Sequence, residues 1–345
     1  MLKLKKVKNY IPFVPLLTFV NIFIYPLSSS KTLNTSQISS TKLTAKKMKT
    51  LEKKIEVIKR KITRIHTPQN ESGFLGSGHI ARRVVGGSFV ETDPFIYLMD
   101  DILDKKDNSP AGAPHPHAGF ETVSLLVDGE ITEMMESMKA GDFQIMTAGS
   151  GTIHTESILQ PTKGRLFQLW LDLPKKDRWV KPRLQIMPAG HVPSSDNNGI
   201  KLRLYSGSLD GLNSPIQNYV PLIVAEFELK PNLINIQKIP ANFNSFIYII
   251  SGSVKVGEDS KQLNKNQVGW LNLFEDDLLS ELKVESGEEG VRFVLYAAKP
   301  LGEEIISSGP FIADTPEDIQ ELYKEYRMGK FKHISTAHES QRITF

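Results

Sequence analysis

The chain has 345 residues, of which 40% are hydrophobic and 23% charged, a composition that excludes a disordered or fibrous protein and leaves room for two domains of about 100 to 150 residues. It contains no cysteine, which excludes disulfides, thiolate zinc sites, iron–sulfur clusters and cysteine nucleophiles, so any metal must be held by nitrogen and oxygen atoms. The formal charge of +3 comes from nine lysines in the acid-free first 51 residues, and the remainder, with 33 basic against 39 acidic residues, argues against direct binding to nucleic acid.

The first 50 residues have the composition of a targeting segment and linker. A basic start, MLKLKKVKN, precedes an apolar stretch that Pro12 and Pro15 interrupt. A membrane span needs about 20 apolar residues and a signal peptide about 7 to 15, so we favour a cleaved signal over an uncleaved anchor, which would be the chain's one contact with a membrane. The Ser-, Thr- and Lys-rich residues that follow resemble a transit peptide. We therefore expect an exported or organellar protein, or a cytoplasmic one if Met48 is the true start.

From Arg60 onward, short runs of β-branched and aromatic residues alternate with clusters of Gly, Pro, Asn and Asp. This spacing predicts an all-β fold of the sandwich or barrel type rather than alternating strands and helices. The pattern pauses at PAGHVPSSDNNG (188–199) and then returns. We predict two β-rich domains, at residues 58–185 and 200–332.

One helix is expected near the C-terminus, in DTPEDIQELYKEYRMGKF (314–331). Thr315 is a suitable N-cap, Pro316 suits the first helical position, and Gly329 is a suitable stop. The apolar stripe of this helix predicts that it packs on a barrel. The stripe consists of Ile319, Leu322, Tyr323 and Tyr326.

Two pairs of polar residues carry the chemistry of the first half. His115 and His117 are two positions apart and therefore project from the same face of a strand, with a proline before each one. His154 and Glu156 repeat this spacing further along the chain. Together the pairs predict a site of three imidazoles and one carboxylate, which suits Fe(II), Mn(II), Ni(II) or Cu(II). Glu121 has the same strand parity as the first pair, so spacing alone leaves either glutamate as the carboxylate ligand.

Other sites are not expected. No histidine lies between His191 and His333, so the second half cannot hold an imidazole-bound metal. Ser150 lacks the flanking glycines of a hydrolase nucleophile elbow, and no dinucleotide or P-loop motif is present. Surface or capping roles are expected for the remaining histidines, which are His66, His79, His191, His333 and His338.

The chain resembles the pirin family of bicupins over roughly residues 58–332. The resemblance rests on five segments in order: DPFIYLMDDI (93–102), HPHAGFETV (115–123), GDFQIMTAGSGTIHTE (141–156), LFQLWLDLP (166–174) and GPFIADTPEDI (309–319). It implies two cupin-type barrels, with one mononuclear iron in the N-terminal barrel. By motif position the metal ligands would be His115, His117, His154 and Glu156, which favours Glu156 over Glu121.

The resemblance also implies two alternative functions. Some bacterial members are quercetin 2,3-dioxygenases, whereas the mammalian member is a nuclear, iron-dependent co-regulator of transcription. Under the first alternative this chain is a dioxygenase for a flavonol-like aromatic substrate, with Glu156 as both metal ligand and proton acceptor. Under the second it is a non-enzymatic, metal-dependent binding protein. Three departures from the family pattern predict a different pocket mouth: Ala118 replaces Arg, Ile145 replaces Trp, and the stretch between Gly129 and Gly141 is shortened.

Overall fold

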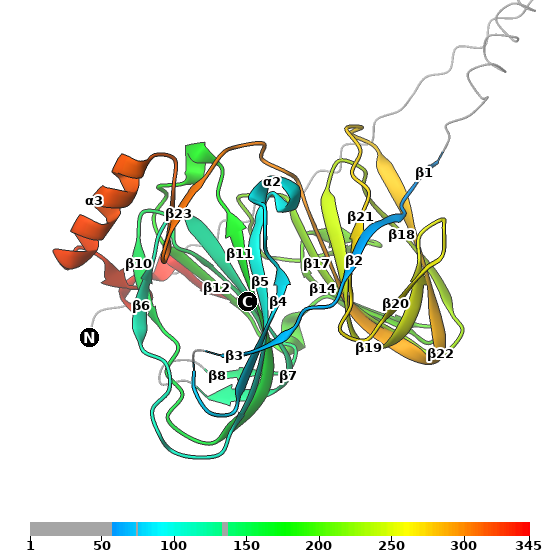
Figure 1. Cartoon of the computed structure of the whole chain (residues 1–345), viewed down its shortest axis with the longest axis horizontal. Coiled ribbons are helices and arrows are strands. Elements are labelled where there is room, and N and C mark those ends of the chain that lie inside the picture. The colour runs from blue at the N-terminus through cyan, green and yellow to red at the C-terminus, as the bar shows by residue number, and fades with distance from the viewer. Residues whose placement is uncertain (1–56, 74, 133–136) are drawn as a thin grey trace, which may run out of the picture. The chain divides into compact units, whose positions relative to one another are not determined.

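A computed structural model of the chain describes residues 57–73, 75–132 and 137–345. Val57–Phe345 form one compact unit. The predicted targeting segment, residues 1–50, lies outside the described residues, and the domain boundaries at 58–185 and 200–332 stay a prediction. Within the described part of the chain, no helix is long and apolar enough to cross a membrane. The predicted all-β fold, with two sheet-rich halves and a C-terminal helix, is confirmed (Figure 1).

The first half is built on a nine-stranded sheet with the order β26-β12-β9-β7-β11-β5-β4-β3, in which β8 adds to β7. Its strands are β3 (Asn70–Ser72), β4 (His79–Val85), β5 (Phe95–Lys105), β7 (Phe120–Thr132), β8 (Ser137–Lys139), β9 (Phe143–Thr147), β11 (Thr162–Asp172), β12 (Arg183–Met187) and β26 (Arg342–Thr344).

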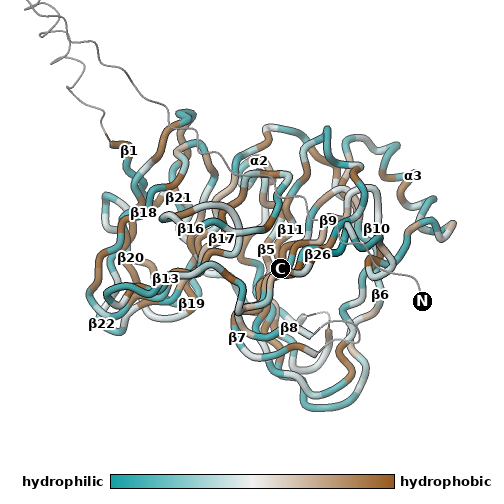
Figure 2. The backbone as a smooth tube through the Cα atoms, turned by 180° about the vertical axis from the view of Figure 1, so that it is seen from behind, coloured by the Kyte–Doolittle hydropathy of each residue, from teal (hydrophilic) through white to brown (hydrophobic). Residues whose placement is uncertain are grey.

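The two faces of this sheet have different roles, as strand β11 shows. Phe167, Leu169 and Leu171 are fully buried in a hydrophobic core that also contains side chains of the second half. Each such burial stabilises the fold by about 1.5–3 kcal/mol. The alternate residues of β11, Leu166, Gln168 and Trp170, line a cavity on the other face, because successive side chains of a strand point to opposite sides. In Figure 2 the most hydrophobic stretches of the chain lie along the strands of the sheets.

A three-stranded sheet, with the order β25-β10-β6, completes the first half. Its strands are β6 (Pro114–His117), β10 (Thr152–Thr155) and β25 (Lys332–His333). Strands β25 and β26 come from the end of the chain, whereas β1 and β2, from its start, pair with strands of the second half. The two halves therefore exchange their terminal strands, and Figure 1 shows the blue β2 beside β21.

The second half is a ten-stranded sheet whose interior is filled by hydrophobic side chains, among them Leu202, Phe227, Ile247 and Phe293. Its strands are β1 (Ile58–Lys59), β2 (Ile62–His66), β13 (Ser194–Asn197), β14 (Ile200–Ser206), β17 (Leu222–Leu229), β18 (Ile234–Pro240), β19 (Asn244–Val256), β20 (Lys261–Asn264), β21 (Val268–Leu271) and β22 (Leu279–Ala298).

The predicted helix is α3 (Pro316–Arg327), and it begins at a capping box in which Thr315 and Asp318 bond to each other's backbone. Ile319 and Leu322 pack against Phe311, as the apolar stripe predicts, whereas Tyr326, at the end of the stripe, is exposed. The remaining elements are α2 (Phe89–Thr92), β15 (Ser208–Leu209), β16 (Leu212–Asn213), β23 (Ile306–Ser308), β24 (Phe311–Ala313) and the 3-10 helices η1 (Lys175–Asp177), η2 (Ala189–His191), η3 (Ile334–Thr336) and η4 (Glu339–Gln341).

Candidate metal centre

Strand β6 presents two histidines from one face. Its sequence, PHPH, contains two prolines, which have no backbone N–H to donate to a neighbouring strand. The strand is at the edge of the three-stranded sheet, where this loss is tolerated. His115 and His117 therefore project together from an extended, stiffened segment.

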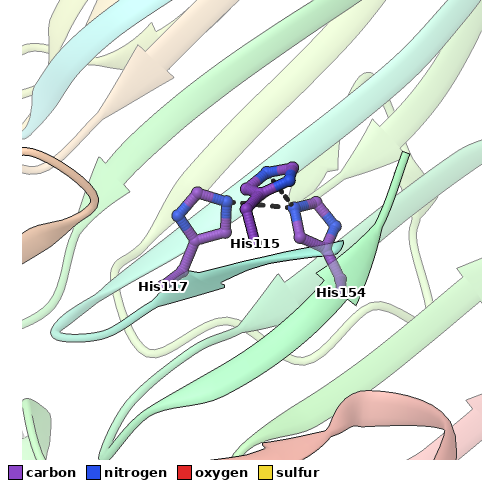
Figure 3. A group of neighbouring side chains, drawn as sticks. All are labelled: His115, His117 and His154. Atoms are coloured by element: carbon purple, nitrogen blue, oxygen red, sulfur yellow. Dashed lines mark hydrogen bonds between the residues drawn. The ribbon is translucent and has the colours of Figure 1, made fainter. Parts of the chain in front are cut away.

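The register between β6 and β10 brings the third histidine opposite the first. The two strands are antiparallel, and His115 pairs directly with His154. The Nε2 atom of His154 lies 2.8 Å from Nε2 of His115 and 3.0 Å from Nε2 of His117. Figure 3 shows the three rings turned toward one another. Three ring nitrogens that converge on one point form a set of donors that a single metal ion fits.

The surroundings of His117 and His154 favour neutral imidazoles, which is the form that binds metal. The Nδ1 atom of His115 lies 2.9 Å from the carbonyl of Ala113, so the proton is at Nδ1 and the lone pair of Nε2 points to the centre. Burial, together with the neighbouring His115 and His333, lowers the pKa of His154 to about 3. Burial and the nearby imidazoles also hold the pKa of His117 well below its usual value.

Glu156 is the carboxylate that approaches this cluster. One of its oxygens lies 3.9 Å from Nε2 of His115 and the other lies 3.8 Å from Nε2 of His154. Burial raises the pKa of Glu156, and its electrostatic interactions with His115 and His79 oppose that rise. A bound cation would favour the ionised carboxylate in the same way. Three imidazole nitrogens thus converge on this point, and the carboxylate of Glu156 lies beside them.

Glu121, the alternative carboxylate, has a different environment. It is fully buried in β7 and accepts a hydrogen bond of 2.6 Å from the hydroxyl of Thr147. Within the described residues it forms no ion pair with a histidine, and its second oxygen has no hydrogen-bond partner. Burial raises its pKa to about 7. The strand-parity argument for Glu121 is wrong because β6 ends at His117 and β7 begins only at Phe120.

Two glycines allow the chain to make this site. Gly119 interrupts the strand with a φ of +86°, and a Cβ there would lie 1.9 Å from the carbonyl oxygen of Ile312. Gly112 has a φ of +74°, and a Cβ there would lie 1.8 Å from the carbonyl oxygen of Glu156. The segment leading into β6 can therefore pass directly against the backbone of Glu156 only with glycine at position 112.

The cluster opens into a cavity of about 590 Å³, a size typical of sites for small organic molecules. His115, His117 and Glu156 form part of its lining. Tyr97 and Trp170 contribute an aromatic wall, with their ring centroids 4.4 Å apart, and Trp170 lies 5.1 Å from the ring of His117. The arrangement can hold a flat aromatic ligand beside a metal ion.

Sequence reasoning missed Asp101 as a residue of this cavity, and it missed the burial of its partner His79. His79, expected at the surface or at a helix cap, is buried and hydrogen-bonded to Asp101, which lines the cavity. Strand alternation in β5 could have indicated that Asp101 faces the cavity. No sequence motif, however, connects Asp101 with His79. The departures Ala118 and Ile145 are fully buried and do not line the cavity.

Two β-rich halves, with a histidine cluster in the first and an apolar interior in the second, define a bicupin that carries one candidate metal centre. The family model named Pirin matches residues 79–171, and the model named Pirin C-terminal cupin domain matches residues 224–332. A pirin-like protein of Solanum lycopersicum is 32% identical over 282 residues, which cover 79% of this chain and 92% of that protein. The chain belongs to the pirin family.

Solved structures share the fold. A quercetin 2,3-dioxygenase from Acinetobacter baumannii is 24% identical, with a TM-score of 0.68 and coverage of 80% of this chain and 99% of that one. The bacterial pirin YhhW from Escherichia coli, solved in complex with nickel(II), is 15% identical with a TM-score of 0.51, covering 69% of this chain and 99% of that one. At these identities, the likeness concerns the fold.

Proposed function

We propose that this pirin is a metal-dependent dioxygenase of the quercetin 2,3-dioxygenase type, which holds one Fe(II) ion through His115, His117, His154 and Glu156 and acts on a flavonol-like aromatic substrate. The observation that carries the proposal is the convergence of three Nε2 atoms within 2.8 and 3.0 Å at the end of an aromatic-walled cavity. The fold shared with the quercetin 2,3-dioxygenase from Acinetobacter baumannii supports this choice of reaction.

When bound, the metal would lower the pKa of a coordinated substrate hydroxyl and hold the substrate beside dioxygen. The protein's own groups do the rest. The aromatic wall of Tyr97 and Trp170 orients a flat substrate and excludes water from the reacting end. The carboxylate of Glu156 lies within 4 Å of two ligand nitrogens, so it can accept the proton that the substrate hydroxyl loses.

Iron is the proposed metal, and manganese, nickel and copper are its competitors, since all four suit nitrogen and oxygen donors. The nickel(II) complex of YhhW makes nickel a real competitor. Elemental analysis of the protein purified from its own source decides among them. We expect about one iron per chain and less of the other metals.

The test of the reaction is oxygen uptake by the iron-loaded chain in the presence of quercetin. We expect one dioxygen consumed per quercetin, with no uptake in the metal-free protein or without quercetin. No turnover at full metal occupancy would contradict the dioxygenase and favour a non-enzymatic, metal-dependent binding protein.

A further inference from the structure

Asp101, which lines the cavity, forms a buried pair with His79. The Nε2 atom of His79 lies 2.7 Å from Oδ1 of Asp101, and the two side chains are 1% and 11% exposed. The backbone N–H of Leu75 donates to Nδ1 of His79 over 3.1 Å. Because Nδ1 accepts this bond, the proton of the neutral ring is at Nε2, which donates to Asp101.

The position of the imidazole is fixed by its packing as well as by its hydrogen bonds. A Cβ at Gly73 would lie 2.0 Å from Nδ1 of His79, so the ring lies directly against the backbone of this glycine. The Oδ1 atom of Asp101 is thus held by a donor that cannot move away. This bond leaves the second oxygen of the carboxylate, Oδ2, to meet a ligand.

Strand alternation directs Asp101 toward the ligand space. Tyr97, Met99, Asp101 and Leu103 occupy alternate positions of β5 and line the cavity. The adjacent Asp100 points the opposite way and is bonded to Arg165. Among the positions of β5 that line the cavity, Asp101 therefore supplies the carboxylate, beside one aromatic and three apolar residues.

Low solvent exposure makes this oxygen a strong acceptor for a ligand. Burial raises the pKa of Asp101, the hydrogen bond from His79 opposes the rise, and the charge of Glu156 adds to it. A ligand hydroxyl that donates to Asp101 would take the place of a water molecule as hydrogen-bond donor. Hydrogen bonds to charged groups are stronger than those between neutral groups.

We propose that Asp101, oriented by His79, determines substrate specificity by accepting a hydrogen bond from a hydroxyl of the substrate other than the one that meets the metal. The inference rests on the proposed function and names its substrate class: aromatics with at least two hydroxyl groups. A site built to bond a hydroxyl discriminates against an analogue that lacks it, because the buried acceptor is then left unpaired.

The test compares two probes by calorimetry on the iron-loaded full chain without oxygen. Quercetin carries several hydroxyls, whereas 3-hydroxyflavone retains only the hydroxyl that would meet the metal. We expect the wild type to bind quercetin at least about tenfold more tightly. In Asp101→Asn this preference should shrink several-fold, while the affinity for 3-hydroxyflavone and the metal content stay unchanged.

The chain offers a matched control. Glu71 also lines the cavity but is exposed to solvent, so Glu71→Gln should retain the preference for quercetin. If Asp101→Asn does not fold, His79→Gln replaces it and should weaken the preference by releasing the carboxylate.

Each outcome is decisive. An equal affinity of the wild type for both probes, or an undiminished preference in the folded variant, would overturn this inference and leave the dioxygenase proposal standing. Binding of neither probe to the iron-loaded wild type would overturn the proposed substrate class and this inference with it.

Discussion

His115 and His154 face each other across the antiparallel strands β6 and β10, with their Nε2 atoms 2.8 Å apart. Two imidazole nitrogens at this distance repel each other unless a proton or a cation lies between them. The fixed Nδ1 bond of His115 to Ala113 excludes a simple rotation of that ring. The cluster is thus arranged for a cation before one binds, which lowers the cost of organising the site.

Replacement of His115 by Ala is expected to abolish metal binding. The variant loses one of three converging nitrogens. Loss of a residue that only hydrogen-bonds to a metal ligand lowers metal affinity about 10- to 100-fold, and we expect a larger fall here. Metal content per chain after dialysis measures the effect. His191→Ala is the control, because His191 is exposed and remote in sequence from the cluster. Equal metal content in the two variants would contradict the ligand assignment.

The two glutamates can be separated in the same way. Glu156→Gln should lower metal affinity by at least about tenfold, because the neutral amide replaces an anionic donor near His115 and His154. Glu121→Gln should leave metal affinity unchanged, because Glu121 is bonded to Thr147 instead. Competitive titration with a chelator measures both affinities. The reverse pattern would make Glu121 the ligand.

Local periodicity was sufficient to predict the architecture and part of the site. Residue order predicts the strand β11, but both of its faces are apolar, so it does not show that Phe167 meets the core and Trp170 the cavity. The spacing of His115 and His117 predicts a shared face. That His154 lies opposite His115, however, depends on the register of two strands that are far apart in the chain.

The remaining features depend on tertiary contacts that have no local signature. The bond between His79 and Asp101 joins β4 to β5 at positions 22 residues apart. The parity assigned to Glu121 is wrong because Gly119, with its positive φ, breaks the strand between Glu121 and His117. Single-sequence patterns cannot show where a strand stops when the turn contains one glycine in an otherwise apolar run.

The buried carboxyl of Glu121 predicts a pH dependence of stability. Its pKa rises from 4.5 to about 7 on folding, so between these values the folded protein retains a proton that the unfolded chain has released. The contribution of Glu121 to the free energy of unfolding should therefore be greatest below about pH 4.5 and fall by up to about 3 kcal/mol as the pH rises to 7. In Glu121→Gln this contribution is absent. Denaturant unfolding of both proteins at several pH values measures the difference, and parallel pH profiles would refute the assignment.

Asp100 is expected to be among the most costly charges to remove. Its carboxylate is fully buried and accepts two bonds of 2.8 Å from Arg165, a third from Arg82, and one of 2.6 Å from the hydroxyl of Tyr248 in the second half. Asp100→Ala leaves Arg165 and Arg82 without their counter-charge, so the free energy of unfolding should fall by about 3–5 kcal/mol.

Two variants calibrate this prediction in the same denaturant experiment. Tyr248→Phe removes one bond to the carboxylate and should cost about 2 kcal/mol, since the charge and both arginines remain. Glu321→Gln breaks the exposed ion pair with Lys324 on α3 and should cost less than about 1 kcal/mol. If Asp100→Ala were no more destabilising than Glu321→Gln, the network around Asp100 would contribute nothing to joining the two halves.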